Sequence, residues 1–122
     1  MNTDKKLFTG LHILGEITTN DWSKLRSLTA VKRHIRDVIK SHKLHELGSF
    51  YYKFPKDGGF TGIISLVESH ISIHTWPELK YLTLDVYLCN YSKDNSTTTK
   101  KVFEEIAIFF KPVKIIKRSI KR

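Results

Sequence analysis

The stretch HISIHTWPELKYLTLDVYLC, residues 70–89, decides the fold, because its side chains alternate between two chemical kinds. Residues 70–76 and 81–89 each show a period of two, which is typical of β-strands with two unlike faces. Pro77 interrupts the pattern between them. One face carries Ile71, Ile73, Thr75, Leu82, Leu84, Val86 and Leu88; the other carries His70, Ser72, His74, Trp76, Tyr81, Thr83, Asp85, Tyr87 and Cys89. The stretch therefore predicts two neighbouring strands of a sheet with one face buried.

Working outward, the preceding residues predict a β-hairpin. SFYYKF at 49–54 has strand composition, PKDGG at 55–59 is typical of a turn, and FTGIISLV at 60–67 again has strand composition. GLHILGEIT at 10–18 and the tail VKIIKRSI at 113–120 predict a first and a last strand.

Two helices complete the prediction. Asn20 or Asp21 offers an N-cap for an amphipathic helix that runs to about Leu44. After a loop at 90–99, apolar residues from Val102 to Phe110 predict a second helix, which Pro112 ends. The order β-α-β-β-β-α-β predicts an α+β fold, a two-layer α/β sandwich with a mainly antiparallel sheet and two helices on one face. Residues 1–122 are expected to form a single domain.

Composition limits the classes of partner. The net charge of +9 is concentrated in residues 24–46, which carry about +5, and residues 100–122, which carry about +6. No nucleic-acid recognition motif accompanies these charges, so we interpret them as solvated faces and expect no nucleic-acid partner. No apolar run is long enough for a membrane span or a secretory signal, so we expect a cytoplasmic protein with no membrane contact. The single cysteine, Cys89, excludes an internal disulfide.

The polar face of the two strands gathers residues that carry chemistry. His70, His74, Asp85 and Cys89 are candidates for a metal cluster, although strand spacing with one cysteine is a weak metal signal. A nucleophilic pair of a thiol and an imidazole is a second interpretation. Spacing along the chain alone establishes neither the metal cluster nor the nucleophilic pair.

The run TGIISLVESHISIHTWPELKYLTLDVYLC, residues 61–89, resembles the self-processing core of the short prokaryotic S-adenosylmethionine decarboxylases. The resemblance rests on Glu-Ser-His, then Ile-His-Thr-Trp-Pro-Glu, then Asp and Cys at fixed distances. It extends more weakly from GLHILGEI to about Phe110. The fold and size of this family agree with the fold predicted above.

The resemblance implies that the chain cuts itself between Glu68 and Ser69. The Ser69 hydroxyl attacks the carbonyl of Glu68 to form an ester, His74 removes the Ser69 α-proton, and a pyruvoyl group remains at Ser69. Residues 1–68 become the β chain and residues 69–122 the α chain. A turn at 68–70 is expected to bring Ser69 and His74 together. The hydroxyl of Thr61 stands where the family has a residue that assists processing.

The resemblance also implies how the processed enzyme works. The pyruvoyl group forms a Schiff base with the substrate amine and accepts electrons as carbon dioxide leaves, with no metal required. Cys89 returns a proton to the α-carbon, and a proton placed on the wrong atom converts the pyruvoyl group into alanine. Glu78 binds the ribose hydroxyls and Phe54 stacks on the adenine, while Trp76 or Tyr81 faces the sulfonium. A homodimer with two sites is expected.

Departures from the family pattern leave alternatives open. Leu79-Lys80 replaces an aromatic-glycine pair, Asn90 follows Cys89 where glycine is usual, and the tail lacks the usual acidic and histidine residues. The expected function is decarboxylation of S-adenosylmethionine to the aminopropyl donor for spermidine. One alternative is a pyruvoyl-dependent arginine or ornithine decarboxylase. The other is an unprocessed basic protein that binds or regulates without catalysis.

Overall fold

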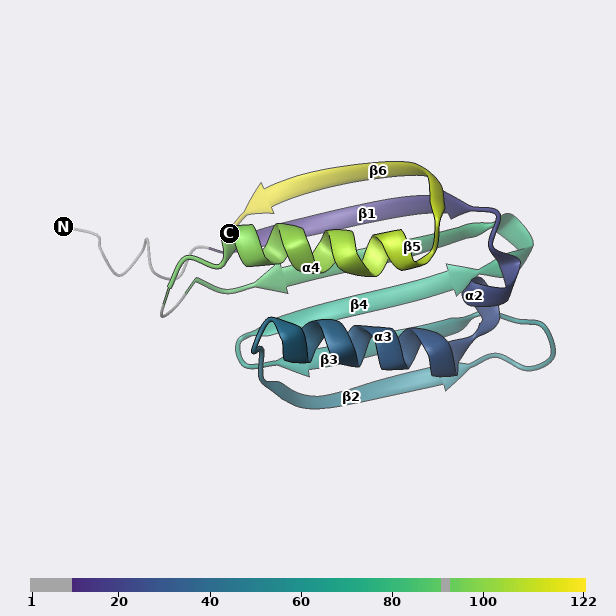
Figure 1. Ribbon diagram of the computed structural model, residues 1–122, viewed down its shortest axis with the longest axis horizontal. Helices are drawn as coiled ribbons and strands as arrows, with labels where there is room; N and C mark the ends of the chain where they lie inside the picture. Colours follow the sequence, from purple (N-terminus) through teal and green to yellow (C-terminus); the bar gives the residue numbers. More distant parts are fainter. Residues whose placement is uncertain (1–9, 91–92) are drawn as a thin grey trace.

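The two alternating segments form the centre of a six-stranded antiparallel sheet (Figure 1). The computed structural model describes residues 10–90 and 93–122, so residues 91–92 of the predicted loop lie outside the described residues. The strands are β1 (Leu11–Thr19), β2 (Glu46–Lys53), β3 (Phe60–Leu66), β4 (Ser69–Trp76), β5 (Tyr81–Leu88) and β6 (Pro112–Lys121). The predicted hairpin and the predicted last strand are both confirmed.

The spatial order of the strands differs from their order in the chain. The sheet runs β2-β3-β4-β5-β1-β6, and every neighbouring pair is antiparallel. The first strand therefore lies between β5 and β6, and the last strand forms one edge. At this edge Arg118 of β6 lies 3.7 Å from the carboxylate of Glu16 on β1.

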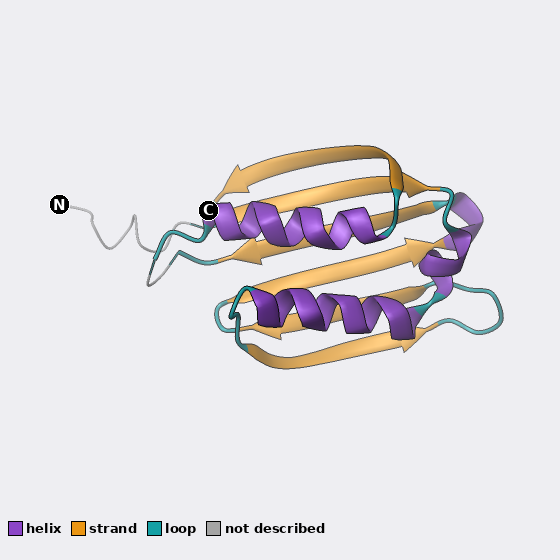
Figure 2. Ribbon diagram, in the orientation of Figure 1, coloured by secondary structure: helices purple, strands orange, loops and turns teal. Residues whose placement is uncertain are grey.

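Two long helices, α3 (Leu28–Ser41) and α4 (Ser96–Phe109), cover the same face of the sheet, which confirms the two-layer sandwich (Figure 2). The alternation of β5 matches its burial residue by residue, with every second side chain in the core. The core joins the apolar face of the sheet to both helices; its largest fully buried members include Phe60, Phe103, Phe110, Ile35, Ile71 and Leu84. The predicted buried face of the alternating stretch is correct.

The prediction of one continuous first helix is wrong, because the chain breaks at Ser27. A short helix, α2 (Trp22–Arg26), ends there, and α3 begins at Leu28 and ends at Ser41 rather than Leu44. Ser27 has φ −91° and ψ 84°, and its side chain accepts a hydrogen bond from the Ala30 N–H at 3.4 Å. Serine is a preferred N-cap because its hydroxyl satisfies a free N–H of the first turn, so it starts a new helix here.

The second long helix begins earlier than predicted. Residues 96–99 were expected in a loop, but α4 already starts at Ser96. The buried Thr99 hydroxyl donates to the Asn95 carbonyl at 2.8 Å, so its polar group is satisfied inside the helix. A threonine can therefore occupy the first turn without breaking it.

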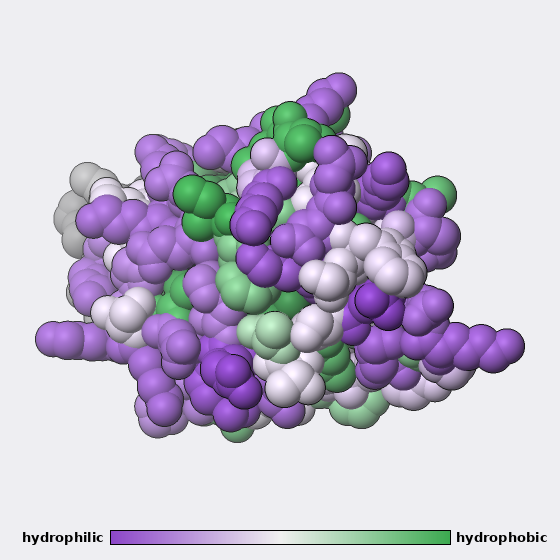
Figure 3. Space-filling model, turned by 45° about the vertical axis from the view of Figure 1, so that its right-hand side comes forward, coloured by the Kyte–Doolittle hydropathy of each residue, from purple (hydrophilic) through white to green (hydrophobic). Residues whose placement is uncertain are grey.

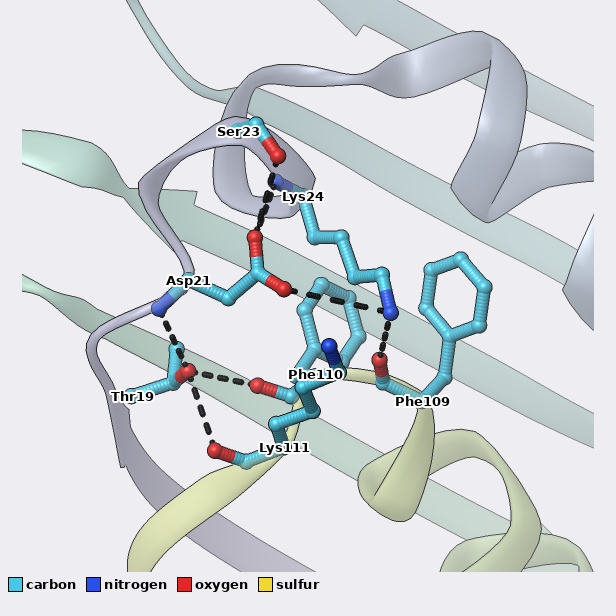
Figure 4. A network of polar contacts seen from close by, with 7 residues as sticks. All are labelled: Thr19, Asp21, Ser23, Lys24, Phe109, Phe110 and Lys111. Atoms are coloured by element: carbon cyan, nitrogen blue, oxygen red, sulfur yellow. Dashed lines mark hydrogen bonds and ion pairs between the residues drawn. The ribbon is translucent and has the colours of Figure 1, made fainter.

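A polar network ties α2 to the turn after α4 (Figure 4). The Thr19 hydroxyl donates to the Phe110 carbonyl, and the Lys24 ammonium donates to the Phe109 carbonyl at 2.9 Å. Asp21 accepts from the Lys24 N–H at 3.2 Å, which caps α2. This network joins the ends of β1 and α4, two segments about ninety residues apart in the chain.

The surface of the molecule is mostly hydrophilic on the face shown in Figure 3, where hydrophilic side chains lie between small apolar patches. Within residues 10–90 and 93–122, no helix has the length and apolar character needed to cross a membrane.

Candidate active site

The predicted cleavage site lies in the tight turn between β3 and β4. Leu66 pairs with Ser69, so only Val67 and Glu68 connect the two strands. Glu68 has a φ of 54°, in the left-handed region that costs a residue with a Cβ roughly 1–2 kcal/mol. Ser69 is the first residue of β4. The residue before the predicted scissile bond is therefore strained, and the residue after it begins a regular strand.

Ser69 lies directly beside Cys89. The backbone N–H of Cys89 donates to the Ser69 Oγ at 3.0 Å, which joins the start of β4 to the end of β5. The Asn95 side-chain amide donates to the Cys89 carbonyl at 2.8 Å, and the Asn95 N–H donates to the Asn90 side chain at 2.7 Å. The structure thus places Ser69 and Cys89 side by side, and Asn95 holds the chain segment that carries Cys89.

A cavity of about 230 Å³ opens at this end of the sheet. It is lined by residues that include Glu68, Ser69, Cys89, Leu44, His45 and Asn95. Sequence reasoning missed His45 and Asn95, since neither belongs to an alternating strand or a motif. The position of Asn95 directly before a helix is the one signal in the sequence that marks it.

Thr61 and His74 form a second pair. They lie opposite each other on β3 and β4, and the Thr61 Oγ1 and the His74 Nδ1 share a hydrogen bond. The ring of Trp76 lies 6.3 Å from that of His74. When Nδ1 donates to the hydroxyl, Nε2 carries the lone pair of a general base. Thr61 therefore orients the imidazole, in agreement with the assisting role implied for it.

The expected turn at 68–70 that brings Ser69 and His74 together is not present. Residues 69–76 are one continuous strand, so five residues at about 3.3 Å each place the two Cα atoms about 16 Å apart. The odd spacing also directs the two side chains to opposite faces. Within one chain, Ser69 with Cys89 and Thr61 with His74 are two separate half-sites.

The residues implied in substrate binding lie at the His74 end of the sheet. Phe54 follows β2, is 47% exposed and makes an edge contact with Tyr52 at a ring distance of 5.0 Å. Glu78 is exposed in the short helix η1 (Pro77–Leu79), next to Trp76, whose ring lies 5.5 Å from that of Tyr81. These aromatic and acidic groups therefore lie near His74 and not near Ser69.

The metal interpretation gains no support from the geometry. Among residues 10–90 and 93–122, no three side chains of His, Cys, Asp or Glu converge as metal ligands would. His74 also lies far from Cys89, at the other end of β4, so these two residues do not form a nucleophilic pair within one chain.

Comparisons with known proteins show the family of the chain. Residues 11–122 match the family model described as S-adenosylmethionine decarboxylase. The chain is 38% identical over 113 residues to the S-adenosylmethionine decarboxylase proenzyme of Sulfurihydrogenibium sp., covering 93% of this chain and 81% of that protein. It is 32% identical over 117 residues to the proenzyme of Thermoplasma volcanium, covering 96% of this chain and 86% of that protein.

A solved structure gives the same result for the fold. The crystal structure of the adenosylmethionine decarboxylase from Aquifex aeolicus superimposes with a TM-score of 0.83 at 31% identity, covering 94% of this chain and 91% of that one. The sequence match and the shared fold each extend over nearly the whole chain, and this chain belongs to the S-adenosylmethionine decarboxylase family.

Proposed function

We propose that this protein is a pyruvoyl-dependent decarboxylase of S-adenosylmethionine that cuts its own chain between Glu68 and Ser69. The observation that carries the proposal is the geometry of Ser69, whose Oγ accepts the Cys89 N–H directly after the left-handed Glu68. Its relatives are named proenzymes, which agrees with a chain that is processed before it acts.

The proposed cleavage begins at the Ser69 hydroxyl. Oγ bonds to the carbonyl carbon of Glu68 while the bond from that carbon to the Ser69 nitrogen breaks, and the hydroxyl proton moves to the nitrogen. The left-handed backbone of Glu68 favours this step, because breaking the peptide bond releases its strain. The Cys89 N–H holds the Ser69 side chain in one orientation, so its proton is free to leave.

His74 and Cys89 serve different stages. His74, oriented by Thr61, is the base that removes the Ser69 α-proton, so that the bond from Cβ to the ester oxygen breaks, the Glu68 carboxylate leaves and dehydroalanine remains. This group rearranges to an imine, and water then replaces its nitrogen, which leaves as ammonia. The resulting pyruvoyl group, when present, supplies an electron-accepting carbonyl that a substrate amine can join. Cys89 then donates its thiol proton to the substrate α-carbon after carbon dioxide has left. The proximity of Ser69 and Cys89 supports this second role.

The separation of Ser69 and His74 supports a two-fold dimer. The face of the sheet opposite the helices carries exposed apolar side chains, including Phe50 at 67% and Ile63 at 51% exposure. A second copy packed on this face, with its β4 antiparallel to the first, places its His74 at the Ser69 end of the first chain. Each site then takes Ser69 and Cys89 from one protomer and Thr61 and His74 from its partner.

The same arrangement brings the substrate groups together. Phe54 and Glu78 lie at the His74 end, so the partner supplies the aromatic ring for the adenine and the carboxylate for the ribose. S-adenosylmethionine has both groups, whereas arginine and ornithine have neither, so S-adenosylmethionine is the preferred substrate. Its product is the aminopropyl donor of spermidine synthesis. A reducing cytoplasm keeps the Cys89 thiol free for its role.

Intact mass and chain composition test the cleavage. The purified protein is expected to consist of two chains, 1–68 and 69–122, with the second blocked to Edman sequencing. Ser69→Ala has no nucleophile and stays whole, His74→Ala cuts at most slowly, and Cys89→Ala still cuts. A wild-type chain that remains whole after prolonged warm incubation refutes the proposal.

Substrate use tests the specificity. Glu78→Gln is expected to cut normally but to raise the KM for S-adenosylmethionine about tenfold or more, because a charged acceptor for the ribose hydroxyls is lost. Turnover of arginine or ornithine in preference to S-adenosylmethionine would overturn the substrate assignment while leaving the cleavage intact.

A further inference from the structure

Three aromatic rings form a triangular cluster on the exposed face of the sheet. Tyr87 on β5 lies opposite His12 on β1 and opposite His70 on β4. The Tyr87 ring lies 5.7 Å from that of His12 and 5.6 Å from that of His70, and the two histidine rings meet edge to face at 5.7 Å. Tyr87 is therefore held from both sides by neighbouring strands.

The backbone of Gly10 packs against the Tyr87 ring. A Cβ built on Gly10 would lie 2.7 Å from Cε1 and 3.0 Å from Cζ of Tyr87, so any larger residue there would displace the ring near its hydroxyl. The same Cβ would lie 2.6 Å from the Leu88 carbonyl oxygen, so the absence of a side chain at Gly10 leaves room for the Tyr87 ring.

His12 behaves as a packing partner rather than as an exposed ion. Its Nε2 is buried and has no hydrogen-bond partner among the described residues. Burial lowers the pKa of His12, Asp85 opposes this effect, and His70 and Arg122 lower the pKa further. A neutral imidazole can lie against the Tyr87 ring without a counter-ion.

Tyr87 lies close in the chain to the thiol beside the predicted cleavage site. Tyr87 belongs to β5, and Cys89 directly follows the last residue of this strand, so the alternation of side chains puts both on the same side of the sheet. Burial, then the neighbouring Cys89 thiol, raises the pKa of Tyr87, and Glu68 adds to the rise. The hydroxyl therefore keeps its proton near neutral pH and is available as a donor to sulfur.

We propose that Tyr87 is a positioning residue for Cys89, whose phenol O–H donates a hydrogen bond to the Cys89 sulfur. This inference rests on the proposed function. When the S–H bond breaks and the proton bonds to the substrate α-carbon, the sulfur is left as a thiolate, and a hydrogen bond to a charged acceptor is stronger than one to a neutral acceptor. The phenol proton stays on oxygen, and the thiolate regains its proton from water before the next turnover. Tyr87 thus directs the proton to the correct carbon.

Tyr87→Phe tests the proposal, because it keeps the ring against the two histidines and removes only the hydroxyl. We expect normal chain cleavage, an unchanged KM and a kcat about tenfold lower. The share of second chains that gain an N-terminal alanine, read by Edman sequencing during turnover, should rise. Tyr51→Phe is the matched control, since it removes a half-buried hydroxyl on the opposite face and should change none of these quantities.

A measurement without turnover uses the uncut Ser69→Ala chain. There, Tyr87→Phe should slow alkylation of Cys89 by iodoacetamide at neutral pH several-fold, because the thiolate loses its donor. In the processed enzyme, adding Tyr87→Phe to Cys89→Ala should have no further effect on residual turnover.

The outcomes separate the two proposals. If the wild-type chain cuts and decarboxylates but Tyr87→Phe matches the wild type in kcat, alanine formation and alkylation, the role of Tyr87 is refuted and the proposed function stands. If Tyr87→Phe stops chain cleavage, the hydroxyl serves processing or folding, and the positioning role is again refuted. A wild-type chain that never cuts refutes both.

Discussion

Glu68 combines an unusual backbone conformation with a central chemical position. It is one of five residues other than glycine with positive φ among the described residues, and the only one of them adjacent to Ser69. Holding a side-chain-bearing residue there costs roughly 1–2 kcal/mol, which a glycine at the same place would not pay. The strain thus lies next to the bond that the proposed processing breaks.

Glu68→Gly is therefore expected to slow self-cleavage roughly fivefold or more, because the precursor loses strain that cleavage would release. The time course of chain cleavage in freshly translated protein measures this. Lys111→Gly is the matched control, since Lys111 has a φ of 50° but lies far along the chain after α4. Equal cleavage rates for Glu68→Gly and the wild type would contradict a role for the strain.

Among the secondary-structure elements, α2 depends most on its cap. This helix has five residues, too few to be stable alone, and Asp21 satisfies its first turn. Although burial alone would raise it, the pKa of Asp21 lies below its ordinary value of 3.8, because the Lys24 N–H and the Ser23 hydroxyl donate to the carboxylate. The network of Figure 4 extends this support to the turn after α4.

Asp21→Ala is expected to lower the free energy of unfolding by about 1 kcal/mol at pH 7. A carboxylate with a lowered folded pKa stabilises the fold above its unfolded value of 3.8 and loses this effect as the pH falls through the folded value. Denaturant unfolding of the uncut Ser69→Ala chain should therefore show the difference shrinking below pH 4.

Asp57→Ala serves as the control for the cap. Its carboxylate pairs with Arg26 at 3.0 Å but is 73% exposed, so its removal should cost little at any pH. A loss for Asp21→Ala that stays constant down to pH 2 would show that the charged cap is not its cause.

The strands were predictable because burial on one face imposes a period of two, and β5 follows that period at every residue. The break at Ser27 was not predictable, because the apolar stripe continues across it and only the cap interrupts the helical backbone. The position of Ser69 beside Cys89 agrees with the motif. The distance between Ser69 and His74 was not predicted. A motif gives the spacing of residues along the chain, but it does not show which residues of a site come from different protomers.

The assembled dimer can be tested by mixing two inactive chains. When Ser69→Ala and His74→Ala chains are co-expressed, the proposed dimer pairs an intact Ser69 on one protomer with an intact His74 on its partner. About half of the His74→Ala chains should then be cut if dimers form at random, as mass analysis of differently tagged chains would show. Each variant expressed alone provides the control.

Cleavage only in cis gives a different outcome, since no chain in the mixture then holds both residues. Absence of cut His74→Ala chain in a mixture proven to contain mixed dimers would exclude a site shared across the two-fold. The two basic blocks are expected to lie away from the interface, because facing them at each other would be costly at low salt.

The strand order also determines what self-cleavage does to folding. The proposed cut leaves β1, β2 and β3 on one fragment and β4, β5 and β6 on the other, while the sheet places β1 between β5 and β6. Neither fragment holds a contiguous half of the sheet, so they separate only if three interstrand ladders break together. The uncut chain folds in a first-order reaction. Once the chain is cut, refolding requires the second-order association of two fragments. After the proposed cut, recovery of the native fold therefore depends on the concentration of the two fragments, whereas folding of the uncut chain does not.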